Sequence, residues 1–218
     1  MKRKTIFYIV FFILLFGGFM YGLGRAIPGF NEVKLPVLSY VQPFSFQDQD
    51  GKTITKNDVL GKVYVAEYFF TTCKGLCPKM NTNMKQVYEL FKDKKDFAIL
   101  SHTVDPETDS VSRMKRYSDS LGVGGSNWWF LTGSKDSLYR AARLSYLLDD
   151  PKNNRESIAN QFIHTQFFAL VDKESRVRKI YDGLKKDELQ EMEKDIRDLL
   201  KEKATGPFAN SLFNNNPE

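Results

Sequence analysis

Cys73 and Cys77 are the two cysteines of this 218-residue chain, and they stand four positions apart in the stretch TTCKGLCP. A thiolate is both the nucleophile of disulfide exchange and a ligand for soft metal ions. A disulfide between these two residues would close a very short loop and would add little stability. The pair therefore predicts redox or metal chemistry rather than a structural cross-link, and its spacing leaves both open.

Of the two histidines in the chain, His164 is the candidate for a third member of this site. It lies just before an apolar segment at 167–171. In enzymes of the thioredoxin fold a cis-proline occupies the turn before the equivalent strand and faces the cysteines, but here no proline occurs between Pro151 and Pro207. Two thiolates and one imidazole suit Cu(I) and can also hold Cu(II). His102 falls inside a second apolar run and is interpreted as structural.

The apolar run Val63–Phe70, interrupted by Glu67, leads directly into the thiols and predicts a strand covered on both faces. A helical pattern follows it to about Asp93. If the CxxxC segment itself is helical, its two thiols project from one face, and the helix dipole together with Lys74 lowers a thiol pKa. Met80 and Met84 share the helical spacing, which favours the core over a role as Cu(I) ligands.

The other elements follow from hydrophobic spacing and turn residues. We expect a hairpin of 44–47 and 52–55 around Asp50-Gly51, strands at 97–104 and 128–131, helices from Asp109 or Ser110 to 121 and over 135–147, a surface loop at 149–161, a strand at 162–172 turning into 177–181, and a helix from 187 to 200. This order, ββ, βαβα, βα and ββα, predicts an α/β, thioredoxin-like fold. Its central mixed sheet of four or five strands would be flanked by helices on both faces.

The N-terminus predicts a single transmembrane helix. Lys2, Arg3 and Lys4 precede an uncharged apolar stretch from Thr5 to Gly24, which is about as long as a bilayer-spanning helix needs to be. The basic cluster should remain cytoplasmic, which places the rest of the chain on the outer side. A cleaved signal peptide is the alternative, but the apolar run is longer than the apolar region of a typical signal peptide.

The chain is therefore divided into an anchor at 1–25, a linker at 26–43, a thioredoxin-like domain at 44–203 and a disordered tail at 204–218. The net charge is +5, and four of the positive charges lie in the anchor with no acidic residue to balance them. The exported part is nearly neutral, so composition argues against nucleic acid as a partner.

Four motifs, in order, resemble those of the Sco/SenC family of copper-binding, membrane-anchored thioredoxin-fold proteins. They are TTCKGLCP, TVDPETD, FLTGSKDSL and FIHTQFFALVDKESRVRKIYDG, within a resemblance that spans about Pro43 to Leu200. The resemblance implies that Cys73, Cys77 and His164 are copper ligands. It also implies that the protein delivers copper to the dinuclear copper centre of cytochrome c oxidase, or reduces the cysteines of that centre, during assembly.

Two functions from different classes thus remain open, a copper chaperone and a thiol–disulfide oxidoreductase, with a copper or redox sensor as a third. The expected partners are the copper-bearing subunit of cytochrome c oxidase or another cuproprotein, together with a thiol reductant. The expected location is the bacterial inner (cytoplasmic) membrane, with one membrane pass and the soluble domain outside. For the oxidoreductase, the sequence leaves the order of thiol attack open.

Overall fold

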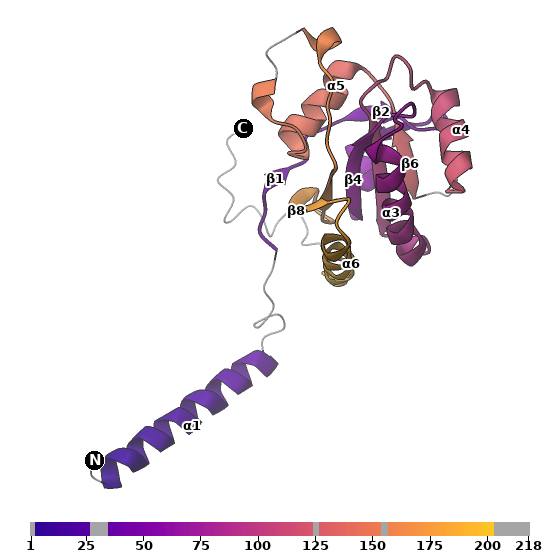
Figure 1. The fold of residues 1–218 in the computed structure, drawn as a ribbon. Helices are drawn as coiled ribbons and strands as arrows, with labels where there is room; N and C mark the ends of the chain where they lie inside the picture. The colour runs from indigo at the N-terminus through magenta and orange to yellow at the C-terminus, as the bar shows by residue number, and fades with distance from the viewer. Residues whose placement is uncertain (1–2, 27–34, 124–126, 154–156, 203–218) are drawn as a thin grey trace. The chain divides into compact units, whose positions relative to one another are not determined.

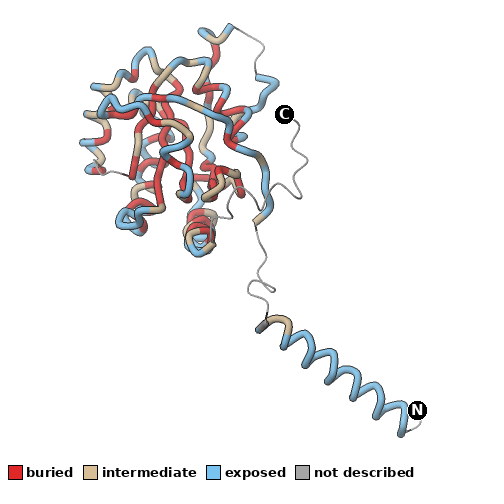
Figure 2. Tube along the Cα trace, turned by 180° about the vertical axis from the view of Figure 1, so that it is seen from behind, coloured by how far each residue is buried: buried red, intermediate tan, exposed pale blue. Residues whose placement is uncertain are grey.

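The computed structural model describes residues 3–26, 35–123, 127–153 and 157–202, and the chain forms two units, Met1–Leu35 and Pro36–Glu218. The first unit holds helix α1 (Arg3–Ala26), which is almost entirely exposed (Figure 2). Among the described residues, this is the one helix whose length and composition would allow it to cross a membrane. The predicted apolar helix is therefore present.

The second unit is built on a six-stranded mixed sheet with the strand order β1-β8-β7-β4-β5-β6 (Figure 1). The three strands β4, β5 and β6 run parallel to one another, and β7, β8 and β1 are added as successive antiparallel pairs. Their bounds are β1 (Ser39–Tyr40), β4 (Val63–Phe69), β5 (Phe97–Thr103), β6 (Trp128–Leu131), β7 (Phe167–Val171) and β8 (Arg176–Asp182). The predicted mixed sheet and the terminal ββα unit are confirmed.

Helices cover both faces of this sheet (Figure 1). The longer ones are α3 (Leu76–Phe91), α4 (Val111–Leu121) and α6 (Lys186–Lys201), while α5 (Lys135–Arg140) continues into a π-helical turn, η1 (Ala141–Ser145). The short elements are α2 (Lys56–Val59), η2 (Pro151–Asn153), η3 (Ile158–Asn160) and the predicted hairpin, β2 (Ser45–Gln47) with β3 (Thr53–Thr55). Gly51 in the hairpin turn has φ +78°, which a glycine adopts without strain.

Strand β4 is buried along its whole length because alternate side chains pack into different layers. On one side, Tyr68 donates a hydrogen bond to the backbone oxygen of Leu138 in α5 (2.8 Å). On the other side, Phe69 stacks on Tyr117 of α4, with ring centroids 5.3 Å apart. Figure 2 shows that the buried residues gather along these central strands. The strand is thus a rigid platform for the loop that follows it.

Two interpretations of single residues are confirmed by burial. Met80 and Met84 are 1% and 0% exposed, so both methionines pack in the core. His102 is 0% exposed and its ring stacks on Tyr68 with centroids 4.9 Å apart, while its Nδ1 lies 3.3 Å from the backbone oxygen of Glu67. His102 is therefore part of the core.

The linker predicted over 26–43 extends too far. The compact unit begins at Pro36, and β1 pairs with β8 at the edge of the sheet. The Leu38 N–H donates to the oxygen of Val177 (2.8 Å), and this pairing makes the sheet six-stranded rather than four- or five-stranded. A strand of two residues shows no periodicity in the sequence, which is why it was missed. The predicted tail, 204–218, lies outside the described residues.

The strand predicted over 162–172 is also shorter, since β7 begins at Phe167. Residues 162–166 make other contacts: the Ile163 N–H donates to the hydroxyl of Tyr139 (3.4 Å), and the Phe167 N–H donates to Thr165 Oγ1 (3.2 Å). The apolar character of this segment extends beyond the sheet because Ile163 packs in the core and Phe162 packs on Phe70, with ring centroids 5.0 Å apart.

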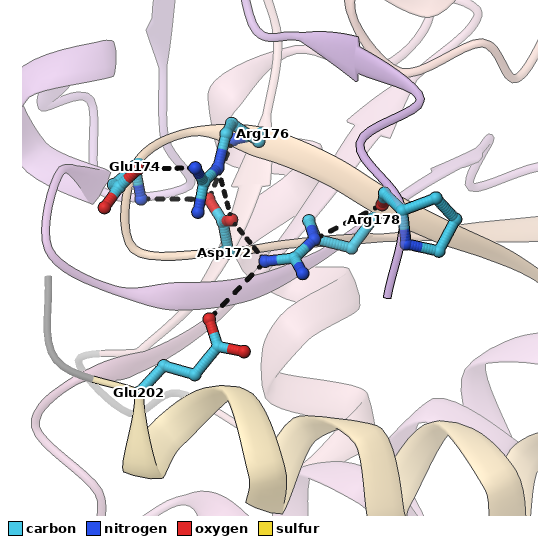
Figure 3. Close-up of polar contacts among 6 residues, drawn as sticks. Asp172, Glu174, Arg176, Arg178 and Glu202 are labelled. Atoms are coloured by element: carbon cyan, nitrogen blue, oxygen red, sulfur yellow. Dashed lines mark hydrogen bonds and ion pairs between the residues drawn. The ribbon is translucent and has the colours of Figure 1, made fainter. Parts of the chain in front are cut away.

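A buried ion-pair network ties the two ends of the second unit together (Figure 3). Asp172 accepts hydrogen bonds from Arg176 Nε (2.7 Å) and Arg178 Nη1 (2.9 Å). Arg178 also reaches the backbone oxygen of Pro36 (3.3 Å) and the carboxylate of Glu202 (3.5 Å). Breaking a buried pair of this kind typically costs about 3–5 kcal/mol. The network therefore closes the domain around its first strand.

Glu67 makes the free energy of unfolding depend on pH. Burial raises its pKa to about 7, although Ser101 Oγ donates a hydrogen bond to its carboxylate (2.5 Å). The folded protein thus holds a proton that the unfolded chain releases above its ordinary pKa of 4.5. This stabilisation is complete below pH 4.5 and is lost as the pH rises through 7.

We expect Glu67→Gln to abolish this component, which amounts to about 3 kcal/mol from the size of the shift. Urea unfolding of the full chain in detergent, repeated between pH 4.5 and 7, measures it. The matched control is Glu107→Gln, which changes an exposed glutamate. A Glu67→Gln variant that keeps the pH dependence of the wild type would contradict the assignment.

Candidate functional site

The paired thiols lie in the loop between β4 and α3, at the carboxyl end of the central strand. The Cys73 N–H donates to the backbone oxygen of Phe70 (3.2 Å), which turns the chain sharply after the strand. Helix α3 begins at Leu76, with Gly75 as its N-cap residue. Cys73 therefore precedes the helix and Cys77 is its second residue, so the segment is not helical throughout and a turn brings the thiols together.

Cys73 is the more acidic thiol. Its partial burial acts to raise its pKa, but hydrogen bonds from the Cys77 thiol and from the backbone N–H groups of residues 75–77 lower the pKa below its ordinary value of 9.0. These N–H groups belong to the start of α3, where they have no partner within the helix. The predicted contribution of the helix N-terminus is present. Lys74 is exposed and is not among the causes of this shift.

Cys77 has the opposite environment. It is 6% exposed, and burial raises the pKa of its thiol to about 12. The hydrogen bond that it donates to Cys73 adds to this effect, and the negative charge of Glu67 contributes a smaller part. Both cysteines are free thiols in the structure. At neutral pH Cys77 is thus a buried proton donor beside a partly exposed sulfur.

A pocket of about 490 Å³ opens over the two sulfurs. Its lining includes Cys73, Cys77 and His164, together with apolar side chains of Phe70 and Leu76. The three residues predicted from the sequence, which are up to 91 positions apart in the chain, therefore surround one pocket. Leu76 is 51% exposed, so part of the rim is apolar surface open to solvent.

His164 is exposed on the rim of this pocket, and its ring packs against Phe162 with centroids 4.9 Å apart. Within the described residues, no group of three or more His, Cys, Asp or Glu side chains is close enough to hold a metal ion. The structure therefore brings the two thiols together and places the imidazole beside them, without a preassembled three-ligand cluster. Rotation of an exposed side chain would require no repacking of the core.

Sequence reasoning missed two acidic residues near the site. Glu67 lies beneath it in β4, and its interruption of an apolar run was the available signal. Asp109 or Ser110 was expected to cap α4, and Ser110 is the N-cap residue. The carboxylate of Asp109 instead accepts a hydrogen bond from the Thr71 N–H (3.1 Å). No pattern in the sequence links Asp109 to Thr71. Asp105 forms the predicted turn, since its backbone oxygen accepts from the Asp109 N–H (2.8 Å).

The fold and the site together define a thioredoxin-like α/β protein with a CxxxC dithiol at the start of helix α3. The family model described as SCO1/SenC matches residues 34–201. The chain therefore belongs to the SCO1/SenC family, as the resemblance in its motifs suggested. It is 32% identical over 171 residues to the SCO1 protein homolog of Bacillus subtilis, which covers 78% of this chain and 87% of that protein.

Solved structures agree with this assignment. BsSco, described as a member of the Sco family of cytochrome c oxidase assembly proteins and as having a disulfide switch, is 29% identical with a TM-score of 0.66. The match covers 78% of this chain and 99% of BsSco. ScoI of Bradyrhizobium japonicum, solved with copper bound, has a TM-score of 0.59 at 23% identity, over 74% of this chain and all of that one. The ScoI likeness shows the fold.

The different environments of the two thiols lead to a labelling prediction. We expect iodoacetamide to modify Cys73 first, because its pKa is lowered and its sulfur is partly exposed, and to leave Cys77 unmodified in the folded protein. The rate at Cys73 should rise with pH, with its midpoint below the ordinary thiol pKa of 9.0. Peptide mapping by mass spectrometry after timed quenching measures both sites.

In a Cys77→Ala variant, Cys73 loses the side-chain donor at position 77, so the midpoint of the pH profile should move upward. Equal labelling of both thiols in the wild type, or labelling of Cys77 first, would contradict this description of the site.

Proposed function

We propose that this protein binds one copper ion through Cys73, Cys77 and His164 and passes it to a copper-bearing subunit of cytochrome c oxidase during assembly of the dinuclear copper centre. The observation that carries this proposal is the convergence of the two thiols and the imidazole on one pocket. Membership of the SCO1/SenC family supports it, as does the copper bound by ScoI, which shares the fold.

The donor set suits a copper ion that must later be released. Thiolate sulfur and imidazole nitrogen are preferred ligands of Cu(I), and a site with three protein ligands leaves room for a donor atom from the acceptor protein. Because burial keeps Cys77 protonated at neutral pH, copper displaces at least this proton when it binds. His164 is exposed and can turn its ring toward the sulfurs.

Helix α1 provides the proposed attachment to the membrane. Its length and apolar composition fit a single span, and the basic residues before it would stay on the cytoplasmic side. The copper site would then lie on the outer side of the bacterial inner membrane. A cleaved signal peptide remains the alternative, and the mass of the N-terminal peptide of the membrane-bound protein distinguishes the two.

Removal of the imidazole tests the copper site directly. We expect the wild type to bind one Cu(I) per chain and His164→Ala to bind it at least about tenfold more weakly, because loss of even an outer-shell partner commonly costs that much. Anaerobic titration of the full chain in detergent against a competing Cu(I) chelator measures the affinity.

The matched control is Thr165→Ala, which changes the next residue of the same pocket rim without removing a soft ligand. Equal copper affinity in the wild type and the His164→Ala variant would overturn the proposed ligand set.

A thiol–disulfide oxidoreductase is the second candidate, and the difference in pKa between the two thiols favours it. The Cys73 thiolate would attack a disulfide of the target, forming a mixed disulfide and releasing one target thiolate. Cys77, after losing its proton, would attack Cys73 and release the second target thiol. Two electrons pass to the target, the chain is left with a Cys73–Cys77 disulfide, and a thiol reductant restores it.

This second candidate predicts which variant traps the target. With Cys77→Ser the mixed disulfide at Cys73 cannot resolve, so a covalent complex with an oxidised dicysteine target peptide should accumulate on non-reducing gels. Cys73→Ser is the control and should trap none, because its remaining thiol is buried and protonated. Trapping by Cys73→Ser instead would reverse the assigned order, and trapping by neither variant would remove this candidate.

A further inference from the structure

Asp109 is a buried carboxylate that has no role in the copper binding or the thiol exchange proposed above. It follows β5 in the turn before α4, and it is 0% exposed. Both of its oxygens point at Thr71, two residues before Cys73. It accepts hydrogen bonds from the Thr71 N–H (3.1 Å to Oδ2) and from the Thr71 hydroxyl (to Oδ1). A single side chain thus holds both the backbone and the side chain of Thr71.

The same carboxylate is fixed from the other side. Thr103 Oγ1 at the end of β5 donates to Asp109 Oδ2 (2.6 Å), and the Asp105 N–H donates to Thr103 Oγ1 (2.9 Å). Arg113 of α4 donates through Nε to Thr71 Oγ1 (2.7 Å), and the same nitrogen lies 3.8 Å from Asp109 Oδ1. Asp109 therefore links the ends of two neighbouring strands and the start of α4.

These contacts lie immediately before the turn that sets the place of the Cys73 sulfur. Residues 74–76 are exposed, whereas Thr71 is hydrogen-bonded to the buried Asp109. A small displacement of Thr71 would move Cys73 relative to the N–H groups of α3 and to Cys77, and both metal binding and disulfide closure depend on that separation.

We propose that Asp109 is a positioning residue for the dithiol, acting on Cys73 through Thr71. This inference deepens the proposed function and rests on it for its biological meaning. It predicts that the hydroxyl of Thr71 matters as much as the carboxylate of Asp109, because the two form one connection. Asp109 touches neither copper nor the target, so its effect on both is indirect.

The test uses four variants of the full chain in detergent. Asp109→Asn removes the charge and one acceptor, and Thr71→Val removes the hydroxyl but keeps the shape. Thr71→Ser keeps the hydroxyl and should rescue the site. Asp172→Asn is the matched control, because Asp172 is also a buried aspartate at the centre of hydrogen bonds (Figure 3). It lies beside the start of β4 rather than its end, since the preceding Val171 pairs with Tyr64.

Two quantities are measured. The first is the equilibrium constant of the Cys73–Cys77 disulfide with dithiothreitol, which needs no copper. The second is the Cu(I) affinity. We expect Asp109→Asn and Thr71→Val to lower disulfide formation and copper affinity about tenfold, on the scale of outer-shell substitutions. Thr71→Ser and Asp172→Asn should stay near the wild type in both, whatever their loss of stability in urea.

The outcomes separate this inference from the function on which it rests. A wild type that binds no copper, with the disulfide equilibrium shifted as expected, refutes the chaperone and retains the positioning role. An unchanged disulfide equilibrium in Thr71→Val overturns the positioning role, because it leaves only a charge effect of Asp109. An equal shift in Asp172→Asn also overturns it, since general loss of stability would then explain the result. If Asp109→Asn fails to fold, Thr71→Val decides.

Discussion

The position of Cys73 just before the start of α3, where backbone N–H groups have no partner within the helix, is the constraint on which the site depends. Hydrogen bonds from residues 75–77 favour the thiolate of Cys73, while burial keeps Cys77 protonated four residues later. The helix terminus and burial together therefore give two chemically identical side chains different pKa values. A ligand that binds both sulfurs, or a disulfide that joins them, therefore involves two thiols with different pKa values.

The rest of the fold holds that contact in place. Strand β4 is buried on both faces, so its carboxyl end cannot shift without disturbing two packed layers. The bond between Asp109 and Thr71 attaches the residues before Cys73 to the end of β5. Because β7 begins only at Phe167, residues 162–166 stay outside the sheet, and His164 lines the same pocket. Rigid support on one side and an exposed imidazole on the other suit the proposed copper site, which must bind the metal and later release it.

Most of the fold followed from local patterns. The apolar run of Val63–Phe70, the helical spacing after Pro78 and the alternating segments near the C-terminus predicted strands and helices in the order observed. Their hydrophobic periodicity reflects which face each element buries, and that is a local property of the chain. The errors occurred where structure does not follow from local periodicity. Residues 39–40 form β1 because β8 lies beside them, and residues 162–166 are apolar although they form no strand.

The site shows the same division. The sequence by itself determined that the chain has one close pair of thiols, that a histidine and no proline precedes β7, and that an apolar N-terminal helix precedes the domain. Only the tertiary structure decided which thiol is the more acidic, that Glu67 keeps a raised pKa, and that Asp109 holds Thr71. Burial and hydrogen bonding are set by residues that are distant in sequence and meet only when the sheet has formed.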